Sequence, residues 1–259
     1  MDNAMKWYDR PWAALIFFTR LPLWRIHQPP KECYSSVVEW WPLAGWLTGA
    51  VMAGTLFAAS LCLPYAVAVL LAIVARMLLT GAFHEDGLAD FIDGFGGGVQ
   101  RERILDIMKD SHIGTYGVLG LVLYTLLLAS ALFSLPPSLA ALTILSADPF
   151  AKMLSSLLVM TMPYARREED AKSKTVYRTI HWPAAISLAV QGLLPMAPCL
   201  MHGGLSTMSF ALRIIIPLLV MLFLYQLIWR RLHGYTGDCC GALCLVIELS
   251  VYITVCSLL

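Results

Sequence analysis

Residues 117–135 read GVLGLVLYTLLLASALFSL, a long apolar run without a charged side chain. The hydrocarbon core of a bilayer is about 30 Å thick, and a helix needs roughly 20 mostly apolar residues to cross it. The run is therefore long enough to span a membrane. The whole chain agrees, since 59% of its residues are hydrophobic, 14% are charged and its mean hydropathy is +0.71. Soluble domains are usually about 25% charged.

Working outward from this run, further stretches of similar length are apolar enough, or nearly so, to cross a membrane. About seven spans are predicted in all: 43–63, 65–83, 117–135, 139–162, 182–201, 205–229 and 239–259. The sequence thus predicts an all-α fold, a polytopic transmembrane helical bundle that forms one integral membrane domain over 1–259.

Ionisable side chains inside these spans need a partner or a cavity. Asp148 and Lys152 stand four residues apart on one predicted helix, and we expect them to neutralise one another. The second span contains Arg76, and the last contains Glu248, which is a functional candidate because of its position in the membrane.

Polar segments that contain Lys and Arg alternate along the chain with turns that contain neither. Lys and Arg occur in the N-terminal segment 1–36, in the acidic glycine-rich loop 84–116, and in the loops 163–181 and 230–238. The intervening turns contain none. Because such residues gather on the cytoplasmic side, we expect the N-terminus and all long polar loops in the cytoplasm.

Charge and cysteine patterns exclude several classes of protein. Lys and Arg total 18 against 17 Asp and Glu, so no basic excess suggests nucleic-acid binding. The seven cysteines form no Cys-x-x-Cys pair, which argues against a cysteine metal site or a disulfide framework. Before the first span, aromatic and basic residues predict an interfacial amphipathic segment.

The most informative polar segment, 84–98, reads HEDGLADFIDGFGGG. Asp86, Asp90 and Asp93 have the spacing i, i+4, i+7, which places them within an arc of about 60° on a helix. Carboxylates that share a face repel one another, and a hard cation such as Mg²⁺ compensates them directly. The following glycines let backbone N–H groups approach phosphate oxygens. The alternative interpretation is a solvated acidic loop that caps a membrane helix.

Two more polar clusters contain candidates for phosphate binding. At 107–117, Lys109 could meet phosphate and Asp110 could complete the metal shell, or the segment is a juxtamembrane anchor. At 230–238, the guanidinium of Arg231 suits phosphate. Anchoring by positive charge explains Arg231 equally well but leaves Asp238 unexplained.

These elements, in order along nearly the whole chain, resemble the cobalamin-5′-phosphate synthase family, also called adenosylcobinamide-GDP ribazoletransferases. The matching stretches are FTRLP at 18–22, WPLAG at 41–45, the acidic segment 84–98, the cluster 107–117, PYAR at 163–166, and GYTGD at 234–238 with Gly-Ala at 241–242. The acidic segment followed by MKDS at 108–111 is highly specific.

The resemblance implies a late step of coenzyme B12 assembly. Adenosylcobinamide-GDP and α-ribazole, or its 5′-phosphate, are joined through a new phosphodiester, and GMP leaves. The family is Mg²⁺-dependent, and it would lie in the bacterial cytoplasmic (inner) membrane. The expected partners are these small molecules and the lipid bilayer; association with other B12-assembly enzymes and homo-oligomerisation are open.

The resemblance also suggests roles for individual residues. Glu85, Asp86, Asp90 and Asp93 are the candidate metal ligands. The ribose hydroxyl would attack the corrinoid-side phosphorus in line, and the catalytic candidates for its proton are Asp90, Asp93 and His84. The substrate and phosphate candidates are Gly96, Gly97, Arg101, Lys109, Asp110, Arg166, Arg231 and Asp238.

Two rival hypotheses come from other classes of membrane protein. A CDP-alcohol phosphotransferase would continue its aspartate-glycine motif with Ala-Arg, whereas here Asp93-Gly94 is followed by Phe-Gly-Gly-Gly at 95–98. A transporter would concentrate ionisable groups near the bilayer midplane, whereas most acids here lie in the predicted loops. Release of GMP would separate an enzyme from a carrier.

Overall fold

The structure is a computed structural model that describes residues 5–166, 177–178, 180–198 and 207–259. Within these ranges every regular element is a helix, so the predicted all-α fold is confirmed. The long helices are α2 (Trp41–Ser60), α3 (Tyr65–Thr80), α6 (Thr115–Ser134), α7 (Pro137–Thr161), α10 (Thr207–Leu232) and α11 (Gly237–Ser257). The shorter ones are α1 (Asp9–Phe18), η1 (Leu23–Arg25), η2 (Lys31–Trp40), α4 (Phe83–Gly97), α5 (Arg101–Lys109), α8 (Trp182–Leu193) and η4 (Leu194–Met196).

The approximate number of seven membrane spans can be compared with the described residues. In the described part, five helices are long and apolar enough to cross a membrane, or six if α3 and α4 count as one bent span. Hydropathy alone does not register the bend after α3 or the end of α8. Pro195 follows α8 closely and, because proline lacks a backbone N–H, favours the end of that helix.

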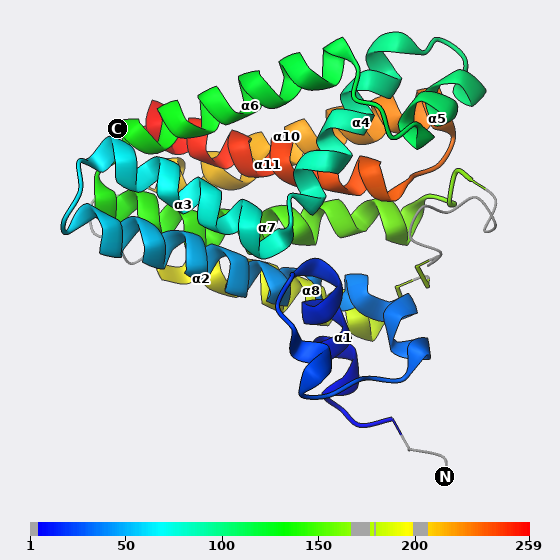
Figure 1. The fold of residues 1–259 in the computed structure, drawn as a ribbon, viewed down its shortest axis with the longest axis horizontal. Coiled ribbons are helices and arrows are strands. Elements are labelled where there is room, and N and C mark those ends of the chain that lie inside the picture. Colours follow the sequence, from blue (N-terminus) through cyan, green and yellow to red (C-terminus); the bar gives the residue numbers. More distant parts are fainter. Residues whose placement is uncertain (1–4, 167–176, 179, 199–206) are drawn as a thin grey trace.

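The long helices run side by side, with α4 and α5 at one end of the bundle (Figure 1). α7 and α11 lie at the centre, where 78% of the apolar window of each is buried. α6 and α10 lie outside, with 33% and 22% of their windows buried. Their exposed side chains are mostly Leu, Val, Ile and Phe, which suits contact with lipid.

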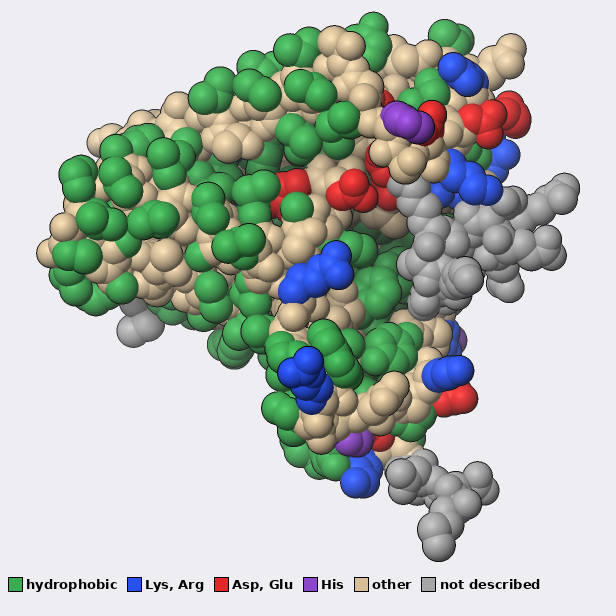
Figure 2. Space-filling model, viewed as in Figure 1, with side chains coloured by type: hydrophobic (Ala, Val, Ile, Leu, Met, Phe, Trp, Pro, Cys, Tyr) green, Lys and Arg blue, Asp and Glu red, His purple; other side chains and the backbone are tan. Residues whose placement is uncertain are grey.

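Charged side chains gather at the end of the molecule where α4 and α5 lie (Figure 2). α6 and α11 also begin there, and α7 and α10 end there. We call this the polar end. The opposite end of the bundle is covered by apolar side chains on the face shown. The segment 84–116, expected to be a loop, forms α4 and α5 instead.

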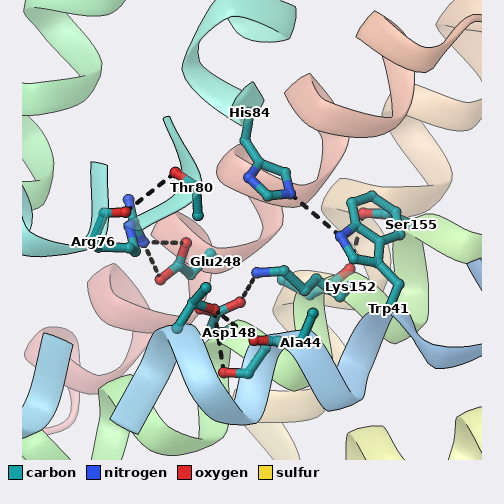
Figure 3. A network of polar contacts seen from close by, with 12 residues as sticks. Trp41, Ala44, Arg76, Thr80, His84, Asp148, Lys152, Ser155 and Glu248 are labelled. Carbon is teal, nitrogen blue, oxygen red and sulfur yellow. Dashed lines mark hydrogen bonds and ion pairs between the residues drawn. The ribbon is translucent and has the colours of Figure 1, made fainter. Parts of the chain in front are cut away.

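A buried ion pair joins the first half of the bundle to its last helix (Figure 3). Nη1 of Arg76 in α3 donates to both carboxylate oxygens of Glu248 in α11, at 2.7 Å each. Nη2 of Arg76 donates to the hydroxyl of Tyr124 in α6 at 2.9 Å, and the hydroxyl of Tyr252 donates to Glu248 at 2.8 Å. Glu85, in α4, lies 3.6 Å from Arg76. Four helices therefore meet at one arginine.

Asp148 and Lys152 form a second buried ion pair, as predicted from their spacing. Both belong to α7 and are almost fully buried. The hydroxyl of Thr48 in α2 donates to the other carboxylate oxygen of Asp148 at 2.5 Å. This contact joins α2 to α7 beside Gly49 and Gly45, whose lack of a side chain lets the two helices pack closely.

We predict that Glu248→Ala lowers the stability of the bundle by about 3–5 kcal/mol, because the buried guanidinium of Arg76 loses its carboxylate. The measurement is the thermal unfolding midpoint of the purified protein in lipid nanodiscs. Glu102→Ala is the matched control, since 76% of that side chain is exposed and little change is expected. A midpoint for Glu248→Ala equal to that of the parent protein would contradict the role given to the pair.

Candidate active site

The site begins with a sharp bend between α3 and α4. Gly81 has φ +67° and Ala82 has φ +55°, so the chain passes through two left-handed residues, and the two helix axes differ by 90°. A side chain at Gly81 would collide with Arg20, whose backbone N–H donates to the carbonyl of Leu79 at 2.7 Å. The bend turns α4 across the polar end, against the start of α11.

Two glycines allow α4 and α11 to approach with backbone contact. A Cβ atom at Gly87 would lie 3.2 Å from Cα of Asp238, and one at Gly241 would lie 3.3 Å from the carbonyl oxygen of His84. Both distances are shorter than ordinary van der Waals contact, so larger residues would push the helices apart. The close approach brings the region of Asp86 next to that of Asp238.

A cavity of about 190 Å³ lies between these helices. Its lining residues are Phe83, Asp86, Gly87, Tyr164, Arg166, Tyr177, Gly237 and Asp238. We call it the α4–α11 cavity. It combines two carboxylates, a guanidinium and the N-terminus of α11, where backbone N–H groups favour anions. A Cβ at Gly237 would meet nothing within 4 Å, so this helix start is open to the cavity.

Arg166 is held over the cavity by pairing between two segments. The backbone N–H of Tyr235 donates to the carbonyl of Pro163 at 3.0 Å, and that of Ala165 donates to Tyr235 at 2.8 Å. Nη2 of Arg166 lies 3.7 Å from Oδ2 of Asp238. Its Nε is buried and has no hydrogen-bond partner among the described residues. One donor of the guanidinium therefore has no partner among the described residues.

Tyr164 adds a hydrogen-bond donor to the same wall. Its side chain is half-buried, and burial raises the pKa of its phenol above the ordinary value. The hydroxyl therefore stays protonated at neutral pH and can donate to a phosphate oxygen. Sequence reasoning gave no role to Tyr164 or Tyr177, although Tyr164 belongs to the matching stretch 163–166.

Two further cavities at the polar end contain other predicted residues. One, of about 290 Å³, is lined by Arg101, Glu102, Leu105, Asp106, Lys109, Ala165 and Arg166. The other, of about 430 Å³, is lined by Asp93, Gly97, Arg103, Asp106, Ile107, Asp110, His112, Ile113, Gly114, Thr115 and Tyr116. Arg166 lines both the first of these and the α4–α11 cavity, so the two are neighbours.

The acidic residues of α4 do not converge on one point. Asp86 is exposed in the α4–α11 cavity, Asp90 is half-buried, and Asp93 is buried. Although their arc is narrow, seven residues of helix separate Asp86 from Asp93 by about 10 Å along the axis, whereas Mg²⁺ ligands lie about 2.1 Å from the ion. Among the described residues, no group of three or more His, Cys, Asp or Glu could hold a metal ion unaided.

Asp93 instead caps the start of α6. Its two carboxylate oxygens accept hydrogen bonds from the backbone N–H groups of Gly114 at 2.7 Å and Gly117 at 2.8 Å. These are among the N–H groups that a helix start leaves without partners. Asp93 therefore fixes α6 against α4. Glu85, the fourth metal candidate, points toward Arg76 within the bundle.

His84 lies next to Trp41 in the interior of the bundle (Figure 3). The indole N–H of Trp41 donates to its Nε2 at 3.3 Å, and the ring is parallel to those of Trp41 and Phe18. Because Nε2 accepts this bond, it carries no proton. His84 does not line the α4–α11 cavity. Its position suits support of α4 better than proton transfer.

Two predicted phosphate ligands hydrogen-bond to backbone carbonyls. Nη2 of Arg231 donates to Gly98 at 2.6 Å, at the end of α4. Nε and Nη2 of Arg101 donate to Leu232 at 2.8 Å and Ala165 at 2.6 Å. Both arginines thus tie together the segments around the cavities.

Of the remaining candidates, Gly97, Lys109 and Asp110 line these cavities, and Gly96 lies in a helix contact. A Cβ at Gly96 would lie 2.8 Å from the ring of Tyr116, so this glycine permits close packing of α4 on α6. The backbone N–H and ring of His112 hydrogen-bond to Asp110 and lower the pKa of its exposed carboxyl. Lys109 lines the 290 Å³ cavity.

The chain was compared with known proteins. The family model described as cobalamin-5-phosphate synthase matches residues 10–256. Relatives named adenosylcobinamide-GDP ribazoletransferase include those of Shewanella amazonensis, 36% identical over 93% of this chain and 92% of the relative, and Leptothrix cholodnii, 38% identical over 93% and 92%. That of Leptospira interrogans is 31% identical over 98% and 97%. No solved structure matches. The chain therefore belongs to the cobalamin-5-phosphate synthase family.

Proposed function

We propose that the protein joins adenosylcobinamide-GDP to α-ribazole, or to its 5′-phosphate, and releases GMP, as a late step of coenzyme B12 assembly. The relatives' names support this activity. The structural observation that carries it is the α4–α11 cavity. There two carboxylates, a buried guanidinium with a spare donor and an open helix N-terminus lie together at the polar end.

The cavity fits a Mg²⁺ ion bound together with a substrate diphosphate. Mg²⁺ is usually held by one or two carboxylates, substrate phosphates and water, which agrees with the absence of a larger ligand group in the described part of the chain. We assign Asp86 and Asp238 as ligands, and Asp90 lies one turn along α4. When bound, the ion would neutralise charge on the diphosphate.

The protein's own groups would position the diphosphate. The guanidinium of Arg166, the hydroxyl of Tyr164 and the N–H groups at the start of α11 would donate to its oxygens. The ribose oxygen of α-ribazole forms a bond to the corrinoid-side phosphorus, while the bond from that phosphorus to the GMP oxygen breaks. A carboxylate of α4 that does not hold the metal would take the hydroxyl proton, and the candidate is Asp90, which is half-buried one turn from Asp86.

We place the protein in the bacterial cytoplasmic membrane with the polar end in the cytoplasm. The support is the position of Lys and Arg, which flank the helix ends at the polar end and are absent from the turns between α2 and α3 and between α6 and α7. A nucleotide-activated, charged substrate would then reach the site without crossing the bilayer.

The direct test is GMP release by the purified protein in lipid vesicles. We expect release only when adenosylcobinamide-GDP, α-ribazole 5′-phosphate and Mg²⁺ are all present. Omission of the second substrate or chelation of the metal should abolish it. If the folded protein moved a corrinoid across the vesicle membrane without releasing GMP, the transporter hypothesis would replace this one.

Asp86→Asn and Asp93→Asn should affect different properties: the first should lower activity and the second should lower stability. Asp86→Asn should reduce GMP release by roughly 10²-fold or more with an unchanged thermal midpoint, because it removes charge from the cavity and its side chain makes no hydrogen bond or ion pair to the described residues. Asp93→Asn should lower the midpoint, since capping interactions contribute about 1 kcal/mol.

Asp90→Asn should abolish activity without affecting membrane insertion. Full activity in Asp86→Asn would refute the site.

Arg166→Lys keeps the positive charge but loses the planar set of donors. Charged hydrogen bonds contribute about 1.5–3 kcal/mol, so KM for adenosylcobinamide-GDP should rise by roughly 10- to 100-fold. Steady-state kinetics over a range of substrate concentrations would measure this. Arg103→Lys, in the 430 Å³ cavity, is the control, and an equal rise in both variants would count against a specific role for Arg166.

A further inference from the structure

The N-terminal unit, which we define as residues 5–40, has an exposed surface that the proposed reaction does not use. It contains α1, η1 and η2 and packs against α2 and α8. It lies beside the bundle rather than within it (Figure 1). Four large apolar side chains protrude from it: Met5 is 46% exposed, Trp7 85%, Trp24 47% and Ile26 76%. Grouped exposed apolar side chains mark an interaction surface.

Charges in this unit are sorted by sign. Asp9 is buried and accepts a hydrogen bond from His27 at 2.6 Å, and the buried Glu39 lies 3.7 Å from Arg10. The exposed bases are Lys6, Arg20, Arg25 and Lys31. Within residues 5–40 the exposed acid is Glu32. Because most acids face inward and most bases outward, the outer surface is basic.

Aromatic residues at the polar end indicate where the N-terminal unit lies relative to the membrane–water interface. Trp182 begins α8 and is 82% exposed, Tyr116 lies in the first turn of α6, and Trp229 lies in the last turn of α10. Exposed Trp and Tyr at helix ends are typical of the membrane–water interface. The backbone N–H of Arg178, shortly before Trp182, donates to the carbonyl of Ser35 in η2 at 2.8 Å, so η2 lies near the start of α8.

We propose that the N-terminal unit is a platform that binds the surface of an anionic lipid bilayer. Trp24 and Ile26 insert among the lipid headgroups, while Arg25, between them, binds lipid phosphate. Arg20 and Lys31 add to the attraction. Binding at a membrane interface depends on buried apolar area and on electrostatic attraction. The apolar, basic and apolar side chains at 24–26 can contribute to both. The surface is independent of the proposed transferase activity.

Chemistry favours a lipid partner over an acidic protein. Trp is the residue most suited to the headgroup region, where one edge of the indole is apolar and the N–H stays hydrated. Basic side chains near an anionic membrane each increase binding on the order of fivefold.

The experiment uses the full-length protein in vesicles of phosphatidylcholine and phosphatidylglycerol. Bromine atoms on the acyl chains quench tryptophans that reach the lipid. Subtracting the emission of Trp24→Phe from that of the parent isolates Trp24. We expect an emission maximum shorter than that of a tryptophan in water, and quenching by the brominated lipids. In the Trp24→Phe background, Val99→Trp is the control, since Val99 is 87% exposed between α4 and α5 and should not be quenched.

A second comparison tests the preference for anionic lipid. Quenching of Trp24 should be stronger when phosphatidylglycerol carries the bromine than when phosphatidylcholine does. In Arg25→Gln combined with Lys31→Gln, this difference should fall by severalfold. A Trp24 signal that is quenched by aqueous iodide and not by either lipid would overturn the proposal and leave the surface to a soluble partner. Equal quenching by both lipids would refute the anionic preference.

Discussion

An arginine in the middle of an apolar bundle imposes the main constraint on this fold. Arg76 cannot face lipid without a large free-energy cost, so α3 must place it next to Glu248 of α11. Tyr124 and Glu85 complete its surroundings. These partners come from α6 and α4, and the requirement to satisfy one guanidinium therefore sets the relative positions of four helices. The Asp148–Lys152 pair places a similar constraint on α2 and α7.

The candidate site depends on this arrangement. Glu85 precedes Asp86, and Glu248 belongs to the helix that begins at Gly237 next to Asp238. The buried network and the cavity are thus two ends of the same contact between α4 and α11. Gly87 and Gly241 let the two helices touch, and the bend at Gly81 and Ala82 points α4 toward that contact. The buried contacts of Arg76 with Glu85 and Glu248 thereby help to position Asp86 and Asp238 at the polar end.

The sequence predicted those features that depend on the length of an apolar run or on the spacing of residues within one helix. Apolar length predicted the helical bundle, and the spacing of Asp148 and Lys152 predicted their pairing. The sequence did not predict features that depend on backbone conformation or on distances along a helix. Hydropathy gave no sign of the left-handed residues at 81–82, and an angular arc on α4 ignored the distance along its axis. The capping role of Asp93 could not be foreseen, because its partners Gly114 and Gly117 lie on another helix.

The central claim is that Asp86 and Asp238 share a divalent cation, and Mn²⁺ binding tests it most directly. Electron paramagnetic resonance measures free Mn²⁺ as the protein in nanodiscs is titrated with adenosylcobinamide-GDP present. We expect about one tightly bound ion per chain. Binding should be lost in Asp86→Asn and in Asp238→Asn but kept in Asp106→Asn, whose residue lines the other two cavities. Equally tight binding by Asp86→Asn and the parent protein would contradict the account.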